Sequence, residues 1–215
     1  MKQSIGRHFL LRYQDVDAAF AKAAIDAAEH MLERLSEDFG IPAEQELFEL
    51  LICPDTASFL TATGKDEQTY QPWMIGNANY EERRLCILSP SCADQPEEEM
   101  LGVVRHEAAH IAFGNISGKS PEEISPLIAE GGAVFLAGQI DGASLKKNGR
   151  PDAFGLQDEE YFFATDGYNY SGAYMGHLIE TYGAQAYIRL YTEAEALEAY
   201  WYEGFEEEAI ERFRS

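Results

Sequence analysis

Two histidines and a glutamate have a spacing that suits metal chemistry. His106 is followed directly by Glu107, and His110 comes one helical turn later. On a helix, residues four positions apart lie one above the other, so both imidazoles could bind one metal ion. Glu107 would lie beside the remaining coordination position, where water needs a base. This HExxH arrangement is typical of zinc hydrolases. The alternative, two histidines that only pack in a core or at a helix end, explains neither the spacing nor Glu107.

The flanking sequence predicts that this stretch is helical and largely buried. Asp94, Pro96 and Glu97 resemble the capped start of a helix, and acidic side chains follow where the helix dipole favours negative charge. A broad apolar surface is formed by Met100, Leu101, Val103, Val104, Ala108, Ile111, Ala112 and Phe113. Gly114 fits a helix end. The two histidines are therefore expected in the last turns of this helix.

A catalytic zinc site of this kind has three protein ligands and one open position. The remaining histidines, His8, His30 and His177, do not continue HExxH in the way that metzincins do. Glu130 is the stronger candidate, because it follows His110 after enough residues for a loop and the start of a second helix. It also lies inside an otherwise apolar helical run, which is unusual for a glutamate. The alternative for Glu130 is a solvated carboxylate, which is common in an acidic chain.

The segment from Leu127 to Ala133, together with HExxH, resembles the gluzincin metallopeptidases of the peptidase MA clan, which are thermolysin-like and aminopeptidase-like enzymes. In that clan, a segment of the form apolar-x-Glu-Gly-x-Ala follows HExxH at about this distance. The resemblance implies one set of Zn²⁺ ligands: His106, His110 and Glu130. It also implies Glu107 as the general base. The chain departs from the thermolysin-like pattern at Val134, where those members carry an Asp that orients the first histidine, so another group must hold His106.

The predicted strand from Trp73 to Tyr80 could bind substrate. In the clan, an edge strand beside the zinc cleft pairs its backbone with an extended peptide, which needs exposed N–H and C=O groups rather than particular side chains. The candidate substrate-binding residues are Gly76, Asn77 and Ala78. An ordinary hairpin edge with a turn at Asn79 to Glu82 is the alternative. The clan's aminopeptidases carry a Glu here that grips the free amine of the substrate, and its absence favours internal peptide cleavage.

Attack of water on an amide creates an oxyanion, which the metal and one further donor usually share. Gluzincins supply that donor from a Tyr or His beyond the third ligand, and the segment before Tyr182 and Gly183 resembles the one that carries it. The candidates here are Tyr168, Tyr170 and His177. The two tyrosines rank together ahead of the histidine, because a histidine on a helix is more often a packed or surface residue. Spacing does not choose between the tyrosines.

Apolar periodicity predicts strands in the first part of the chain and helices in the second. The expected strands are Phe9 to Tyr13, Leu47 to Cys53, Trp73 to Tyr80 and Leu85 to Leu88. Besides the HExxH helix, the expected helices are one that begins after Asp15 or Asp17 and ends near Gly40, then Asp55 to Thr63, Pro126 to Leu136, Ser171 to Tyr182, Ala184 to Thr192 and Phe205 to Phe213.

This order predicts an α+β fold, in which a small, mostly antiparallel sheet packs over the HExxH helix and a helical C-terminal lobe follows. The order also resembles the gluzincin catalytic core, and this resemblance implies a zincin-like fold. We expect a single domain over residues 1–215, with a strand-rich part at 1–93 and a helical part at 94–215 that carries the zinc site.

The chain carries a formal net charge of −22, which argues against nucleic acid or an anionic membrane as a partner. The charge would favour basic peptide substrates, although acid-rich faces are usually just solvated. No run approaches the length of a membrane span, and no secretory apolar core follows the N-terminus. Cys53, Cys86 and Cys92 are odd in number and lack metal-ligand spacing, so we expect reduced thiols in a cytoplasmic protein, with Cys53 and Cys86 in the core.

The sequence therefore predicts a zinc-dependent peptidase that acts on a peptide or protein substrate, with internal cleavage favoured. Two alternatives stay open: a zinc hydrolase of a non-peptide amide or ester, and a non-catalytic gluzincin-like binding domain. Glu107 counts against the second alternative, because a structural metal site needs no base. The sequence leaves the oligomeric state open.

Overall fold

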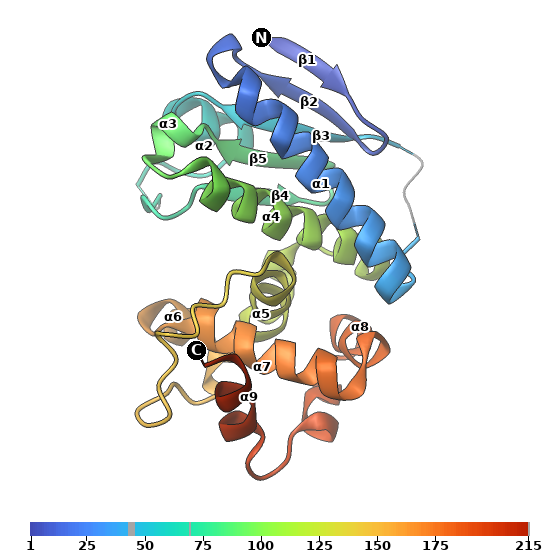
Figure 1. Ribbon diagram of the computed structural model, residues 1–215, viewed down its shortest axis with the longest axis vertical. Coiled ribbons are helices and arrows are strands. Elements are labelled where there is room, and N and C mark those ends of the chain that lie inside the picture. The colour runs from blue at the N-terminus through green and yellow to red at the C-terminus, as the bar shows by residue number, and fades with distance from the viewer. Residues whose placement is uncertain (43–45, 69, 215) are drawn as a thin grey trace. The chain divides into compact units, whose positions relative to one another are not determined.

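The computed structural model describes residues 1–42, 46–68 and 70–214 (Figure 1). Contacts between residues divide the chain into two compact units, Met1–Ser120 and Pro121–Ser215. The first unit contains the described strands and the helix with the HExxH residues, and the second contains helices. The α+β class predicted from the sequence is confirmed.

Among the described residues, the first unit is built around a mixed five-stranded sheet of order β1-β2-β3-β5-β4. Its strands are β1 (Lys2–Ile5), β2 (Phe9–Tyr13), β3 (Phe48–Cys53), β4 (Gly76–Asn79) and β5 (Arg84–Leu88). β3 pairs in parallel with both β2 and β5, whereas β1 and β4 are antiparallel to their neighbours. The prediction of a mostly antiparallel sheet is therefore wrong. The physical reason differs for the two parallel pairs. A helix connects β2 to β3, and such a crossover returns a strand in parallel. β5 runs parallel to β3 because β4 lies between them in the chain and the β4–β5 hairpin reverses the direction once more.

The helices of this unit are α1 (Ala18–Phe39), α2 (Thr56–Thr63), α3 (Pro90–Ala93) and α4 (Glu97–Ser117), with a 3₁₀ turn at Asp15–Asp17. As predicted, α1 begins after Asp17 and ends at Gly40, whose left-handed backbone suits glycine. Asp55 caps α2, because its side chain accepts a hydrogen bond of 2.7 Å from the backbone N–H of Ser58. Local sequence signals thus account for the end of α1 and the start of α2. Asp17 occupies the N-cap position of α1, but its side chain makes no capping hydrogen bond.

Helices cover both faces of this sheet. On one face α1 packs against α4, and α4 packs against β4 and β5 (Figure 1). On the other face, Phe59 of α2 packs with Cys53, Cys86 and Leu88. Both of these cysteines are buried and free, as predicted. Because side chains alternate along a strand, the neighbouring positions point to the α4 face, where Ile87 is fully buried.

The ends of α4 differ from the prediction. Asp94 does not cap this helix, because it ends α3 with a left-handed backbone, and Pro96 occupies the N-cap position of α4. Gly114 does not end the helix, which continues to its left-handed C-cap at Gly118. A Cβ at Gly114 would lie 2.7 Å from the ring of Tyr80. This glycine therefore allows the helix to pack closely against the turn that follows β4.

The described residues of the second unit form helices and the loops between them. Its α-helices are α5 (Pro126–Ala137), α6 (Glu159–Ala164), α7 (Gly167–Tyr182), α8 (Ala184–Thr192) and α9 (Phe205–Phe213), and its 3₁₀ segments are Pro121–Glu123, Gly155–Gln157 and Ala194–Tyr200. The predicted bounds of α8 and α9 are confirmed, whereas α7 begins one turn before the predicted Ser171. The sequence analysis does not predict α6, because its 6 residues are too few for apolar periodicity to appear.

α5 and α7 pack closely because glycines lie at their contact. A Cβ at Gly131 would lie 2.5 Å from the carbonyl oxygen of Ser171. In the opposite direction, a Cβ at Gly172 would lie 2.5 Å from Cγ1 of Val134. These contacts hold the helix that carries Glu130 against the longest helix of the second unit.

Candidate metal centre

His106 and His110 lie one turn apart on α4, with both side chains largely buried. Their Nε2 atoms are 3.1 Å apart. Two Zn–N bonds of about 2.05 Å at a tetrahedral angle would separate the nitrogens by about 3.3 Å. The distance between the imidazole nitrogens therefore fits two ligands of one ion.

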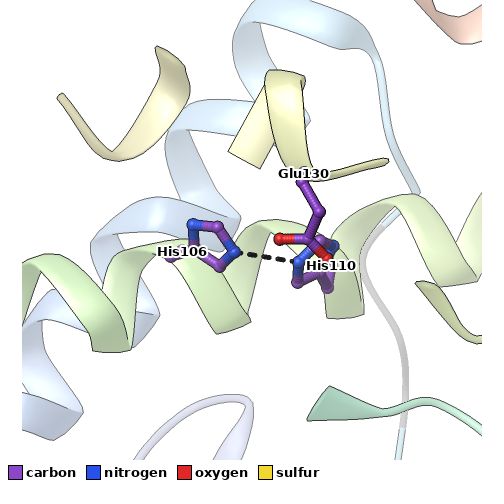
Figure 2. A group of neighbouring side chains, drawn as sticks. All are labelled: His106, His110 and Glu130. Atoms are coloured by element: carbon purple, nitrogen blue, oxygen red, sulfur yellow. Dashed lines mark hydrogen bonds between the residues drawn. The ribbon is translucent and has the colours of Figure 1, made fainter. Parts of the chain in front are cut away.

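Glu130 lies on α5 and is partly buried, between the buried residues Ala129 and Gly131. The ligand atoms of His106, His110 and Glu130 all lie within 4.8 Å of one another, in a group that could hold a metal ion (Figure 2). Two imidazoles and one carboxylate are a donor set found at catalytic zinc sites, where a fourth position stays open for water. The residues present fit such an ion.

Glu107 is 8% exposed and lies on the same helix as the two histidines. Its carboxylate is next to the backbone of β4, since a Cβ built on Gly76 would be 2.5 Å from Oε1 of Glu107. Glu107 is thus a buried carboxylate on the helix that carries both histidines, and its role as a general base stays a prediction.

The candidate substrate-binding residues lie in β4, which is one of the two outer strands of the described sheet. β4 is shorter than the predicted strand, because the chain turns at Trp73 and becomes extended only at Gly76. Ala78 is buried against the sheet, whereas Gly76 and Asn77 are partly buried. The hairpin alternative is also present, since β4 and β5 are joined by a turn in which Asn79 Oδ1 accepts a hydrogen bond from the N–H of Glu82. The two interpretations are compatible, because a hairpin strand still has one outer edge.

The three candidate oxyanion donors lie on α7 in different surroundings. The hydroxyl of Tyr170 is buried and interacts with the backbone of Lys146, whose N–H donates to it over 2.9 Å. Tyr168 is partly buried, and its ring contacts Phe162 and Phe163. Tyr170 therefore has a structural function for its hydroxyl, while the role of Tyr168 stays a prediction.

His177 is paired within the second unit. Its Nε2 lies 3.1 Å from the hydroxyl of Tyr202, which in turn donates to Glu208 over 2.7 Å. Because that hydroxyl proton is used on Glu208, the Nε2–H of a neutral imidazole donates to Tyr202, and Nδ1 carries no proton. Nδ1 is buried without a hydrogen-bond partner among the described residues. This arrangement accounts for His177 without an oxyanion role.

Protonation of His177 is expected to destabilise the second unit. Burial lowers its pKa below the ordinary value of about 6.5, and the nearby positive charge of Arg212 lowers it further, while Glu208 and Glu180 oppose this. The unfolded chain therefore binds more protons in acid, so stability should be full above about pH 6.5 and fall as the pH drops below that value.

The measurement is the melting temperature between pH 5 and 8 for the wild type and for His177→Phe. The variant keeps a buried aromatic ring but has nothing to titrate, so its melting curve should depend less on pH. An equal pH dependence in both proteins would contradict this assignment.

The sequence analysis did not identify two buried tyrosines of α8, Tyr187 and Tyr191. Burial raises the pKa of both hydroxyls, and the negative charge of Glu130 raises it further. Tyr187 donates a 2.7 Å hydrogen bond to the carbonyl oxygen of Ile128, in the turn of α5 before Glu130. The available signal was the spacing of four between the tyrosines, which places both rings on one face of a helix.

Neither a scan against protein-family models nor a search of curated proteins finds a match to this chain. Within the described residues, no helix combines the length and the apolar character needed to cross a bilayer.

Proposed function

We propose that this protein is a zinc-dependent peptidase of the gluzincin type, and that it cleaves internal peptide bonds. The observation that carries the proposal is the group formed by His106, His110 and Glu130, with Glu107 beside it on the same helix as the histidines. A metal site with a purely structural role is usually closed by four ligands and needs no adjacent base. Three ligands and a buried glutamate fit a hydrolytic site better.

In this proposal the two imidazoles and the Glu130 carboxylate hold the ion. When bound, zinc supplies the Lewis acidity that makes water a nucleophile at neutral pH. Glu107 accepts a proton from that water at its carboxylate and later delivers it to the nitrogen of the leaving amine. Proton transfer from water to the leaving amine is therefore the role proposed for Glu107.

Two further roles complete the proposal. The hydroxyl of Tyr168 donates a hydrogen bond to the carbonyl oxygen that gains charge during the attack. Tyr168 is preferred because the hydroxyl of Tyr170 is already bound to the backbone of Lys146. The outer edge of β4 pairs with the backbone of an extended substrate, which needs no particular side chain. The residues of that pairing are Gly76, Asn77 and Ala78.

Zinc content is the first test. Wild-type protein offered Zn²⁺ and then dialysed should contain about one zinc per chain by elemental analysis. Glu130→Ala should bind zinc at least about 100-fold more weakly, because the loss of a direct ligand should cost no less than the loss of an outer-shell partner. Glu160→Ala, which removes an exposed glutamate of α6, serves as the control and should keep its zinc.

The outcomes separate the alternatives. A wild type that stays free of zinc would contradict the enzyme proposal. A Glu130→Ala variant that keeps its zinc would require another third ligand. A zinc-loaded wild type that cleaves an amide or ester but no peptide would support the alternative non-peptide hydrolase.

A further inference from the structure

A single glycine separates strand β4 from the side chains of helix α4. A Cβ at Gly76 would lie 2.5 Å from Oε1 and 3.0 Å from Cγ of Glu107, and 2.6 Å from Cγ1 of Val103. Gly76 is not among the residues with a positive φ angle, so its backbone conformation does not require glycine. The requirement is space: the side chains of α4 occupy the volume that any larger residue at position 76 would need.

The turn that follows β4 also makes a close contact with α4. There a Cβ at Gly114 of α4 would lie 2.7 Å from the ring of Tyr80. Here the turn after β4 supplies the large side chain and the helix supplies the glycine. At Gly76 the arrangement is reversed, and the side chain that fills the space is Glu107. Two glycines thus allow this contact, but only one of them adjoins Glu107.

We propose that Gly76 is a positioning residue for Glu107. The strand backbone at Gly76 lies against the buried carboxylate of Glu107. This contact keeps the carboxylate close to α4, the helix that carries the two histidines. A methyl group at position 76 would push the carboxylate or the strand away, and a displacement near 1 Å is enough to impair proton transfer. The catalytic meaning of this inference rests on the proposed function. The inference assigns the need for glycine at position 76 to Glu107, whereas the sequence interpretation assigns it to the close approach of a substrate backbone. Pairing of β4 with substrate uses only backbone groups, which alanine keeps.

The first experiment separates these two interpretations by kinetics. Gly76→Ala should lower kcat by about 100-fold with little change in KM and no loss of zinc, because the base is displaced. If Gly76 serves mainly to admit the substrate backbone, the variant should instead raise KM and keep kcat. That second result would overturn the proposal.

Matched variants test whether any packing defect in this contact has the same effect. Gly114→Ala creates a similar overlap, with Tyr80, and should lower the melting temperature without a comparable fall in kcat. Adding Val103→Ala to Gly76→Ala removes the second overlap at position 76, so stability should partly recover while kcat stays low. A full return of kcat in that double variant would assign the effect to general packing and overturn the proposal.

A second experiment does not depend on activity. Gly76→Ala should lower the melting temperature by about 5 °C in the wild type, and by clearly less in a Glu107→Ala background, where the volume is free. An equal fall in both backgrounds would overturn the contact with Glu107. If the wild type cleaves no peptide but the two melting shifts differ as expected, the contact stands and the proposed function fails instead.

Discussion

Replacing Glu107 with glutamine is expected to lower kcat for peptide hydrolysis by about 10³-fold while zinc content is retained. Glutamine has nearly the shape of glutamate, so it fits the buried position next to Gly76. Its neutral amide oxygen and nitrogen cannot take a proton from water, so the variant removes the base and little else. The measurement is steady-state cleavage of a fluorogenic peptide library, with elemental analysis of zinc on the same samples.

The matched control for this prediction is Glu99→Gln, which neutralises an exposed glutamate in the first turn of the same helix. This variant should keep the wild-type kcat. A Glu107→Gln variant with wild-type kcat would show that the general base has been assigned to the wrong residue. Loss of zinc from Glu107→Gln would show that this carboxylate supports the metal site itself, in which case the kinetic result would not report on proton transfer.

The sequence was sufficient for the part of the site that depends on one helix. That His106 and His110 lie on one face of a helix, one turn apart, follows from their spacing of four residues. The ends of α4 could not be predicted in the same way. Asp94 and Gly114 have residue types that suit a cap and a stop, but Asp94 serves the short helix before α4 and Gly114 serves a contact with Tyr80. Residue type thus identified candidate cap and end residues for α4, but tertiary contacts determined where the helix begins and ends.

The direction of the strands was predicted wrongly although a signal was present. Alternating apolar residues identify a strand such as β3 but do not indicate which way its neighbours run. The helix of 22 residues between β2 and β3 was itself predicted, and a connection of that length favours a parallel pair over a hairpin. The short spacing between β4 and β5 correctly suggested the antiparallel hairpin. Connection length therefore carried information that strand periodicity lacks.

The choice between Tyr168 and Tyr170 lay beyond the sequence for a different reason. Both have the same chemistry and nearly the same position relative to Glu130. The hydroxyl of Tyr170 is bound by the backbone of Lys146, which lies far from it in the sequence, in the loop after α5. A hydrogen bond between distant segments leaves no local pattern, so only the fold could show that this hydroxyl has a partner. Glu130 was easier to identify, because a carboxylate in an apolar helical run is visible locally.

Gly132→Ala is expected to destabilise the second unit by about 3 kcal/mol and to lower its melting temperature by roughly 10 °C. A Cβ at Gly132 would lie 1.6 Å from the hydroxyl oxygen of Tyr187 and 2.2 Å from its Cζ. Tyr187 is fully buried and packs on Tyr191, with 5.4 Å between the ring centroids, so it has little room to move aside. Its hydrogen bond to the carbonyl oxygen of Ile128 would also be disturbed. Alanine improves helix propensity by only about 1 kcal/mol, which is too small to offset this overlap.

Thermal unfolding of Gly132→Ala in two backgrounds tests the cause. In Tyr187→Ala the overlapping ring is absent, so adding Gly132→Ala should cost little or should stabilise α5 slightly through helix propensity. An equally large loss in both backgrounds would mean that Tyr187 is not the source of the conflict. Glu130 lies two positions before Gly132 on α5. If α5 must stay in place for the Glu130 carboxylate to act as a ligand, the folded fraction of Gly132→Ala should also bind zinc more weakly. Zinc affinity that is unchanged in a clearly destabilised variant would separate the stability of α5 from the geometry of the proposed site.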